Sequence, residues 1–121
     1  IAVGEKPYTE GVGDRDSLFL SQDNKKLLKK VKRTKIPYVV VLISGRPMII
    51  EQELEESHAF IAAWLPGTEG KGISDVIFGD FDFTGKLSMT WPRSMKQLPI
   101  NYGDSSYDPL FRFGFGLSYK K

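Results

Sequence analysis

Carboxylates near the start of the chain are the residues whose type and spacing could do chemistry. Glu5, Glu10, Asp14 and Asp16 lie in one short segment, with Tyr8 between the two glutamates. Paired carboxyl groups can hydrolyse a glycosidic bond, because one protonates the leaving oxygen while the other attacks the sugar carbon or activates water. Acidic residues in a glycine-containing loop commonly make local turns or are solvated, so composition alone favours a structural role.

Other catalytic chemistries find little support in the residues. His58 is the only histidine and cysteine is absent, so neither a Ser-His-Asp triad nor a His or Cys metal site is expected. The glycine-rich turn at 67–72 precedes a predicted helix, as phosphate-binding loops do. It matches neither nucleotide-binding motif, and Glu69 would place a negative charge beside the phosphate. We therefore expect no metal and no cofactor.

The charge pattern does not indicate a nucleic-acid or membrane partner. The net charge is only +2, and the excess lysine is concentrated between Lys25 and Lys35. The solvated outer face of a helix explains this cluster better than an anionic partner does. No apolar run reaches the roughly 20 residues of a membrane helix, and the N-terminus lacks the regions of a signal peptide. We expect a chain that binds neither nucleic acid nor a membrane.

Three apolar runs predict parallel strands. The central run, Tyr38–Ile43, is unbroken and rich in β-branched residues, which favours a strand covered on both faces. Further strands are expected near 1–5 and 59–65. The turn at 44–47 lies at the carboxyl edge of the sheet, where α/β proteins collect ligands. Residues 6–21 form a long loop off the same edge, and loops of this length are usually functional.

Two helices are expected, near 23–34 and 70–78. Ser21 or Asp23 caps the first helix, whose buried face is expected to carry the stripe Leu27, Leu28 and Val31.

Residues 51–57 favour a short helical turn, and alternation predicts an edge strand near 86–91. Whether this edge strand is parallel or antiparallel stays open. The apolar segment 93–121 is expected to wrap back on a core. The predicted fold class is α/β: the C-terminal part of a three-layer α/β/α sandwich with a mostly parallel sheet and one edge strand.

Several consecutive motifs carry a family resemblance. In order, they are GEKPYTEGVGD (4–14), VVVLISGRP (39–47), AAWLPGTEGKG (62–72), VIFGDFDFTGKLSMTWP (76–92), QLPINYGD (97–104) and YDPLFRFGFGLSY (107–119). Nearly the whole chain thus resembles the C-terminal α/β domain of family 3 glycoside hydrolases, the plant-type β-glucan exohydrolases and β-glucosidases above all. The resemblance implies that residues 1–121 are this domain, N-terminally truncated and without the barrel domain.

The resemblance also implies a function. These enzymes are retaining, exo-acting β-glucosidases whose site lies between a (β/α)8 barrel and this domain. The family's general acid/base falls on Glu10, with Glu5 as the weaker candidate. The nucleophile is an aspartate of the barrel, in a motif that this sequence lacks, so the chain alone is expected to be inactive. The implied partners are the barrel domain and a β-glucoside or β-glucan oligosaccharide, and the resemblance favours a secreted or periplasmic enzyme.

A second hypothesis stays open beside the first. A chain of this fold can also be a non-catalytic carbohydrate-binding or structural module, with no turnover of its own. A barrel bearing the nucleophile aspartate upstream of Ile1 would favour the enzyme. An unrelated or absent partner would favour the module.

Overall fold

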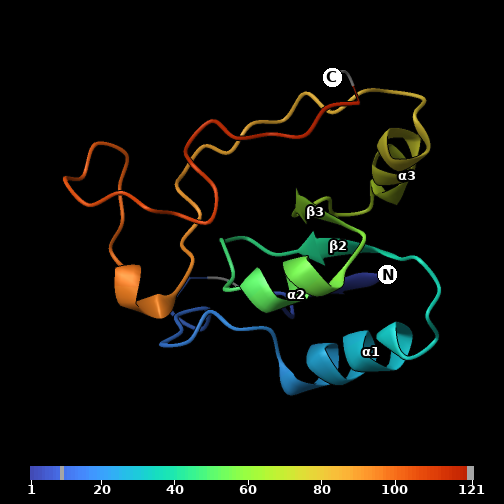
Figure 1. The fold of residues 1–121 in the computed structure, drawn as a ribbon, viewed down its shortest axis with the longest axis horizontal. Coiled ribbons are helices and arrows are strands. Elements are labelled where there is room, and N and C mark those ends of the chain that lie inside the picture. Colours follow the sequence, from blue (N-terminus) through green and yellow to red (C-terminus); the bar gives the residue numbers. More distant parts are fainter. Residues whose placement is uncertain (9, 120–121) are drawn as a thin grey trace. The chain divides into compact units, whose positions relative to one another are not determined.

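The computed structural model describes residues 1–8 and 10–119 (Figure 1). The chain divides into two compact units, Ile1–Leu65 and Pro66–Lys121. The first unit contains a parallel sheet with two helices. The second contains one α-helix, a short 3-10 helix and extended segments that run beside one another.

The sheet of the first unit has three parallel strands in the order β1-β2-β3. These are β1 (Ala2–Gly4), β2 (Val39–Ile43) and β3 (Ala59–Trp64). Both outer strands pair with β2, which is therefore central, as its apolar run predicts. The predicted α/β class and the three predicted strands are confirmed.

The burial of β2 differs from the expectation of a strand covered on both faces. Val40 and Leu42 are completely buried, whereas Val39, Val41 and Ile43 are only partly buried. The crossovers β1-to-β2 and β2-to-β3 step across the sheet in the same direction, so right-handed connections place both helices over one face. Within the unit Ile1–Leu65, the helices therefore cover one face of the sheet.

The two helices of this unit are α1 (Gln22–Lys32) and α2 (Glu51–Glu56). Ion pairs join them side by side, from Lys32 to Glu56 at 3.1 Å and from Lys25 to Glu53 at 3.9 Å. The two helices match the predicted helix near 23–34 and the predicted helical turn at 51–57.

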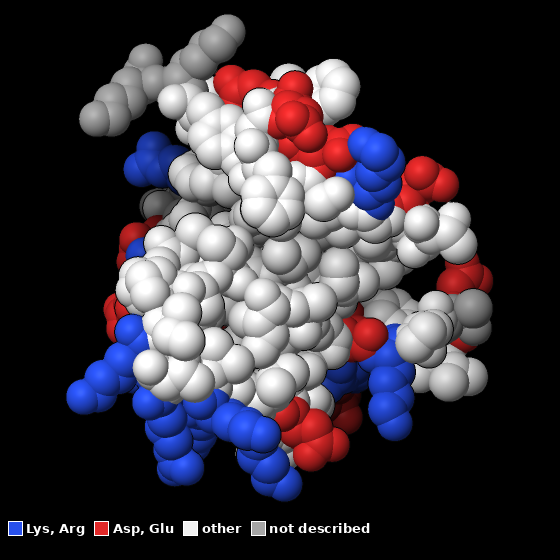
Figure 2. All heavy atoms as spheres, turned by 90° about the vertical axis from the view of Figure 1, so that its right-hand side faces the viewer, with Lys and Arg blue, Asp and Glu red and all other residues white. Residues whose placement is uncertain are grey.

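Ser21 caps α1, because its hydroxyl accepts the backbone N–H of Asn24. Of the predicted apolar stripe, Leu28 is buried, but Leu27 is 41% exposed. Figure 2 shows Lys and Arg side chains gathered at the lower edge of the view, the level of α1 in Figure 1. Among the seven basic residues of 25–35, all but Lys25 are exposed, as expected for a solvated face.

The second unit confirms one prediction and corrects another. Helix α3 (Gly70–Phe78) lies where a helix was predicted, and η1 (Met95–Gln97) is a short 3-10 helix. The predicted edge strand 86–91 is wrong: this segment belongs to no sheet in the described residues. It lies antiparallel to the C-terminal segment, with backbone hydrogen bonds from Trp91 to Phe111 and from Leu87 to Phe115.

The spacing of these backbone hydrogen bonds explains why residues 86–91 form no regular strand. The two segments exchange hydrogen bonds around Trp91 and again around Leu87, which leaves an isolated bridge in place of a continuous ladder. Trp91 is 2% exposed and meets Phe111 edge to face, so the C-terminal segment does wrap back on a core. Figure 1 shows the two segments, orange and red, running together.

Candidate functional site

The candidate site begins where β1 and β2 end at the same edge of the sheet. Parallel pairing sets Gly4 beside Ile43, and the N–H of Glu5 donates to the Ile43 carbonyl oxygen at 3.0 Å. A Cβ at Gly4 would overlap that carbonyl oxygen, so glycine permits the close approach of the two backbones. Glu5 and the turn at 44–47 therefore leave the sheet next to each other.

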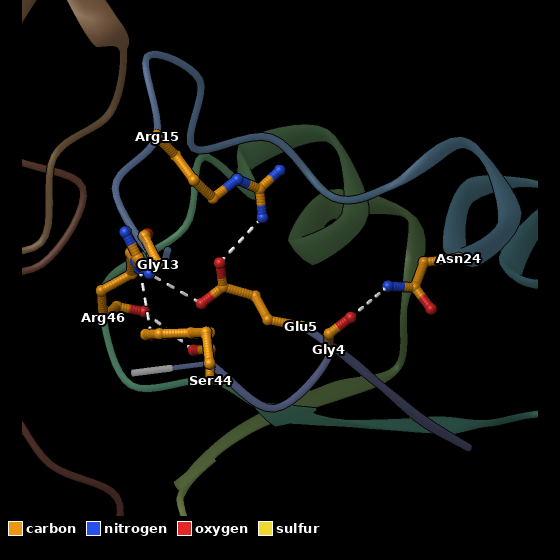
Figure 3. A network of polar contacts seen from close by, with 8 residues as sticks. Gly4, Glu5, Gly13, Arg15, Asn24, Ser44 and Arg46 are labelled. Atoms are coloured by element: carbon orange, nitrogen blue, oxygen red, sulfur yellow. Dashed lines mark hydrogen bonds and ion pairs between the residues drawn. The ribbon is translucent and has the colours of Figure 1, made fainter. Parts of the chain in front are cut away.

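Glu5 lies buried between two arginines (Figure 3). Its side chain is 3% exposed. Arg15 donates from Nη1 to Oε1 at 2.8 Å, and Arg46 places Nε 3.3 Å from Oε2. Both oxygens therefore face a guanidinium group, and the carboxylate is closed to solvent.

Arg46 binds two positions of the loop that follows β1. Its Nε donates to the Tyr8 hydroxyl at 3.0 Å, its Nη2 donates to the Gly13 carbonyl oxygen at 2.7 Å, and its Cζ lies 4.2 Å from the centre of the Tyr8 ring. Nε carries a single hydrogen and donates it to Tyr8. Glu5 Oε2 therefore lies near the positive charge of Arg46 but accepts no hydrogen bond from it. The Tyr8 hydrogen bond and the charge of Glu5 raise the pKa of Arg46, although its burial acts in the opposite direction.

Surrounding contacts hold this arginine in place. The Ser44 hydroxyl donates to the carbonyl oxygen of Arg46 at 2.8 Å. Gly45 leaves room for Tyr8, because a Cβ there would lie 2.6 Å from the Tyr8 hydroxyl oxygen. On the helix side, the Asn24 amide donates to the Gly4 carbonyl oxygen at 2.6 Å (Figure 3), which ties α1 to the end of β1.

The loop tip, defined here by its described residues 10–12, projects beyond these anchors. Gly11 has a positive φ of 74°, and its carbonyl oxygen accepts the N–H of Asp14 at 3.0 Å, so the tip is a tight turn. Glu10 is exposed and Val12 is 89% exposed. Within the described residues, no hydrogen bond or ion pair engages the Glu10 carboxylate.

The two candidate glutamates thus have different chemical capacities. A general acid/base must reach the proton that it transfers. Glu10 is open to a substrate, whereas Glu5 is enclosed and faces two arginines. The exposed Asp14 and Asp16 complete the carboxylates of the loop. The assignment of Glu10, or of Glu5, as acid/base stays a prediction.

Other predicted features have clear places. His58 is exposed, accepts the Tyr38 N–H at Nδ1 (3.3 Å) and packs edge to face on that ring, so it lies at the surface. Residues 1–8 and 10–119 contain no group of three or more His, Cys, Asp or Glu side chains placed to hold a metal ion. Over the same residues, no helix is long and apolar enough to cross a membrane.

Sequence reasoning missed Arg46 and Arg15. Tyr8 and Arg46 are 38 positions apart, so their contact follows from the pairing of β1 with β2 and not from local spacing. The signal available was an arginine directly after Ser44-Gly45 at the carboxyl edge of the central strand, next to a loop rich in carboxylates.

Comparisons with known proteins identify the family that the chain resembles. The family model described as the glycosyl hydrolase family 3 C-terminal domain matches residues 1–119. The periplasmic beta-glucosidase of Salmonella typhimurium is 34% identical over 97% of this chain and 18% of its own length. The beta-xylosidase of Formosa agariphila is 38% identical over 98% of this chain and 19% of its own length.

Solved structures give the same result. The exo-1,3/1,4-beta-glucanase of a Pseudoalteromonas species superposes with a TM-score of 0.90 at 46% identity, covering 99% of this chain and 16% of that one. The beta-glucosidase of Listeria innocua superposes with a TM-score of 0.88 at 30% identity, covering 98% and 20%. The chain therefore spans about one fifth or less of the proteins it matches.

Proposed function

Because the chain belongs to the glycosyl hydrolase family 3 C-terminal domain family, we propose that it supplies the general acid/base to a retaining β-glucosidase or β-glucan exohydrolase. The enzyme removes terminal β-D-glucosyl residues from the non-reducing end of its substrate. Glu10 is the acid/base. The nucleophile comes from a (β/α)8 barrel domain outside this chain.

The observation that carries this proposal is the exposure of Glu10 on an anchored loop. Retaining hydrolysis needs two carboxyl groups about 5 Å apart, on the two sides of the glycosidic bond. When two domains each supply one, a loop must project from one domain toward the other. The tip at 10–12 projects from the carboxyl edge of a parallel sheet, and Arg46 holds its base.

From the names of the relatives, we propose the identity of the sugar that the enzyme removes. The structure with 46% identity is described as an exo-1,3/1,4-beta-glucanase, which favours a glucan. A relative at 38% identity is described as a beta-xylosidase, so xylosides are the competing substrates. Comparing aryl β-glucosides with aryl β-xylosides in the complete enzyme decides between them, and we expect the larger kcat/KM for the glucoside.

Change of Glu10 to glutamine tests the proposed role. In the complete enzyme, Glu10→Gln should lower kcat/KM about 100-fold or more for substrates with poor leaving groups, which depend on protonation. Glycosylation by activated aryl glucosides should be nearly unchanged. Asp14→Asn, at another exposed carboxylate of the loop, is the matched control and should keep normal activity with both substrates.

The non-catalytic alternative predicts a different outcome. A carbohydrate-binding or structural module would leave turnover independent of Glu10. This chain by itself should hydrolyse no glucoside under the catalytic proposal, because it lacks the nucleophile. Hydrolysis of aryl glucosides by the isolated chain would contradict the proposal that another domain supplies the nucleophile.

A further inference from the structure

We propose that Arg46 is a positioning residue for Glu10, setting where the acid/base carboxyl lies by holding the loop on both sides of its tip. The inference rests on the proposed function of Glu10. It assigns to Arg46 a role in the proton-transfer step without any contact between Arg46 and the substrate.

The geometry of Arg46 carries the inference. One guanidinium group binds Tyr8, two positions before Glu10, and Gly13, three positions after it. The contact with Tyr8 combines a hydrogen bond at 3.0 Å with stacking of the guanidinium over the ring at 4.2 Å. Because one side chain holds the loop on both sides of the tip, a shift of Arg46 is expected to move Glu10.

Arg46 is itself fixed by rigid parts of the fold. It follows β2, the central strand, and its carbonyl oxygen accepts the Ser44 hydroxyl. Its side chain is 22% exposed and lies against the buried carboxylate of Glu5. The planar guanidinium group of Arg46, which makes several contacts at once, therefore links the central strand of the sheet to the exposed loop tip. Lysine cannot reproduce this arrangement, because it presents a single point charge.

Glu5 has a matching part in this arrangement. It balances the charge of Arg46 at one oxygen and binds Arg15, from the returning arm of the loop, at the other. The carboxylate thus ties two arginines to the end of β1. Glu5 acts here as a support for Arg46, which explains why it is enclosed while Glu10 is open.

The test uses the complete enzyme and a series of aryl β-glucosides with different leaving-group pKa values. Misplacing a catalytic group by about 1 Å costs on the order of 100-fold in rate. Arg46→Met should therefore lower kcat/KM about 10- to 100-fold for the poorest leaving groups and much less for activated ones. Arg46→Lys should fall between Arg46→Met and the parent enzyme. Arg33→Met, at an exposed arginine after α1, is the matched control and should behave as the parent.

A double variant separates positioning from general loss of structure. If Arg46 acts through Glu10, then Glu10→Gln combined with Arg46→Met should be no more than about 2-fold slower than Glu10→Gln alone. Multiplied losses in the double variant, or an equal loss across all leaving groups in Arg46→Met, overturn the proposal. Should Arg46→Met fail to fold, Arg46→Lys in the same two backgrounds gives the same decision.

Failure of the proposed function has its own signature. If Glu10→Gln alone shows no dependence on the leaving group, Glu10 is not the acid/base, and the role of Arg46 falls with it. If Glu10→Gln behaves as expected but Arg46→Met and Arg46→Lys leave the leaving-group dependence unchanged, only the Arg46 proposal is wrong.

Discussion

Glu5 and Glu10 have the same side chain in opposite surroundings. Glu5 is 3% exposed and faces Arg15 and Arg46, whereas Glu10 stands on an exposed turn. Removing one partner of a buried ion pair costs about 3–5 kcal/mol, because the other charge is left without compensation. Surroundings, more than residue type, therefore separate a structural carboxylate from one that can meet a substrate.

At Gly4, the absence of a side chain is itself a requirement of the site. A Cβ there would overlap the backbone of Ile43, which cannot rotate away as a side chain would. Gly4→Ala should lower the free energy of unfolding by about 1–3 kcal/mol, the usual cost of overpacking. Urea unfolding measures the change.

Gly72 provides the control for this prediction. It lies in α3, and a Cβ there would meet no atom within 4 Å. Gly72→Ala should be neutral or stabilise by about 0.5–1 kcal/mol, because alanine favours the helix. Equal unfolding midpoints for Gly4→Ala and the parent protein would show that β1 and β2 do not approach as described.

At the scale of elements, α1 and α2 are held together through Glu56. A hydrogen bond from Gln52, followed by one from Lys32, lowers the pKa of Glu56 below its ordinary value of 4.5. A carboxyl group whose pKa is lower in the folded state stabilises the fold above its unfolded pKa. That contribution is lost as the pH falls through the folded value.

Lys32→Met should therefore destabilise the protein in a pH-dependent way. The loss should be about 0.5 kcal/mol at neutral pH, typical of a solvent-accessible ion pair, and should shrink as the pH falls from about 7 to about 3. Urea unfolding over this range measures it. Lys30→Met, at an exposed lysine of the same helix, serves as the control. A loss that stays constant with pH would mean that Glu56 is not the group involved.

Local pattern predicted most elements. The apolar runs between glycine and proline breakers located β2 and β3, and Ser21 with a lysine-rich amphipathic stretch located α1. The segment 86–91 was predicted wrongly, because alternation cannot reveal how many backbone bonds a distant partner will supply. The role of Arg46 was not predicted for a related reason: Arg46 follows β2, whereas its partners Tyr8 and Gly13 lie in the loop after β1. The role of Glu10 came from family resemblance and stays a prediction.

At the scale of the whole molecule, the chain spans about one fifth or less of its relatives and exposes much apolar surface. Strands β1 and β3 each pair only with β2 in the described residues, so each presents an open edge. Large apolar side chains more than half exposed include Val12, Ile36, Leu65, Phe78, Phe81 and Tyr102. Surfaces of this kind mark interfaces with other domains or chains.

We therefore expect the isolated chain to self-associate or to be poorly soluble. Analytical ultracentrifugation measures its mass in solution, and calorimetry measures its unfolding. If the proposed barrel domain covers part of this surface, adding it as a separate chain should reduce the self-association. A monomer that melts cooperatively without any added domain would contradict this expectation.

Rescue of Glu10→Gln by azide tests the central claim most directly. In the complete enzyme, with an activated aryl β-glucoside, the variant should form the glycosyl-enzyme and then turn over slowly, because no general base activates water. Azide needs no general base, so it should restore turnover and give β-glucosyl azide, with retained configuration, detectable by NMR. Unchanged activity of Glu10→Gln on poor leaving groups, or azide rescue of Glu5→Gln in its place, would contradict the assignment of Glu10 as the acid/base.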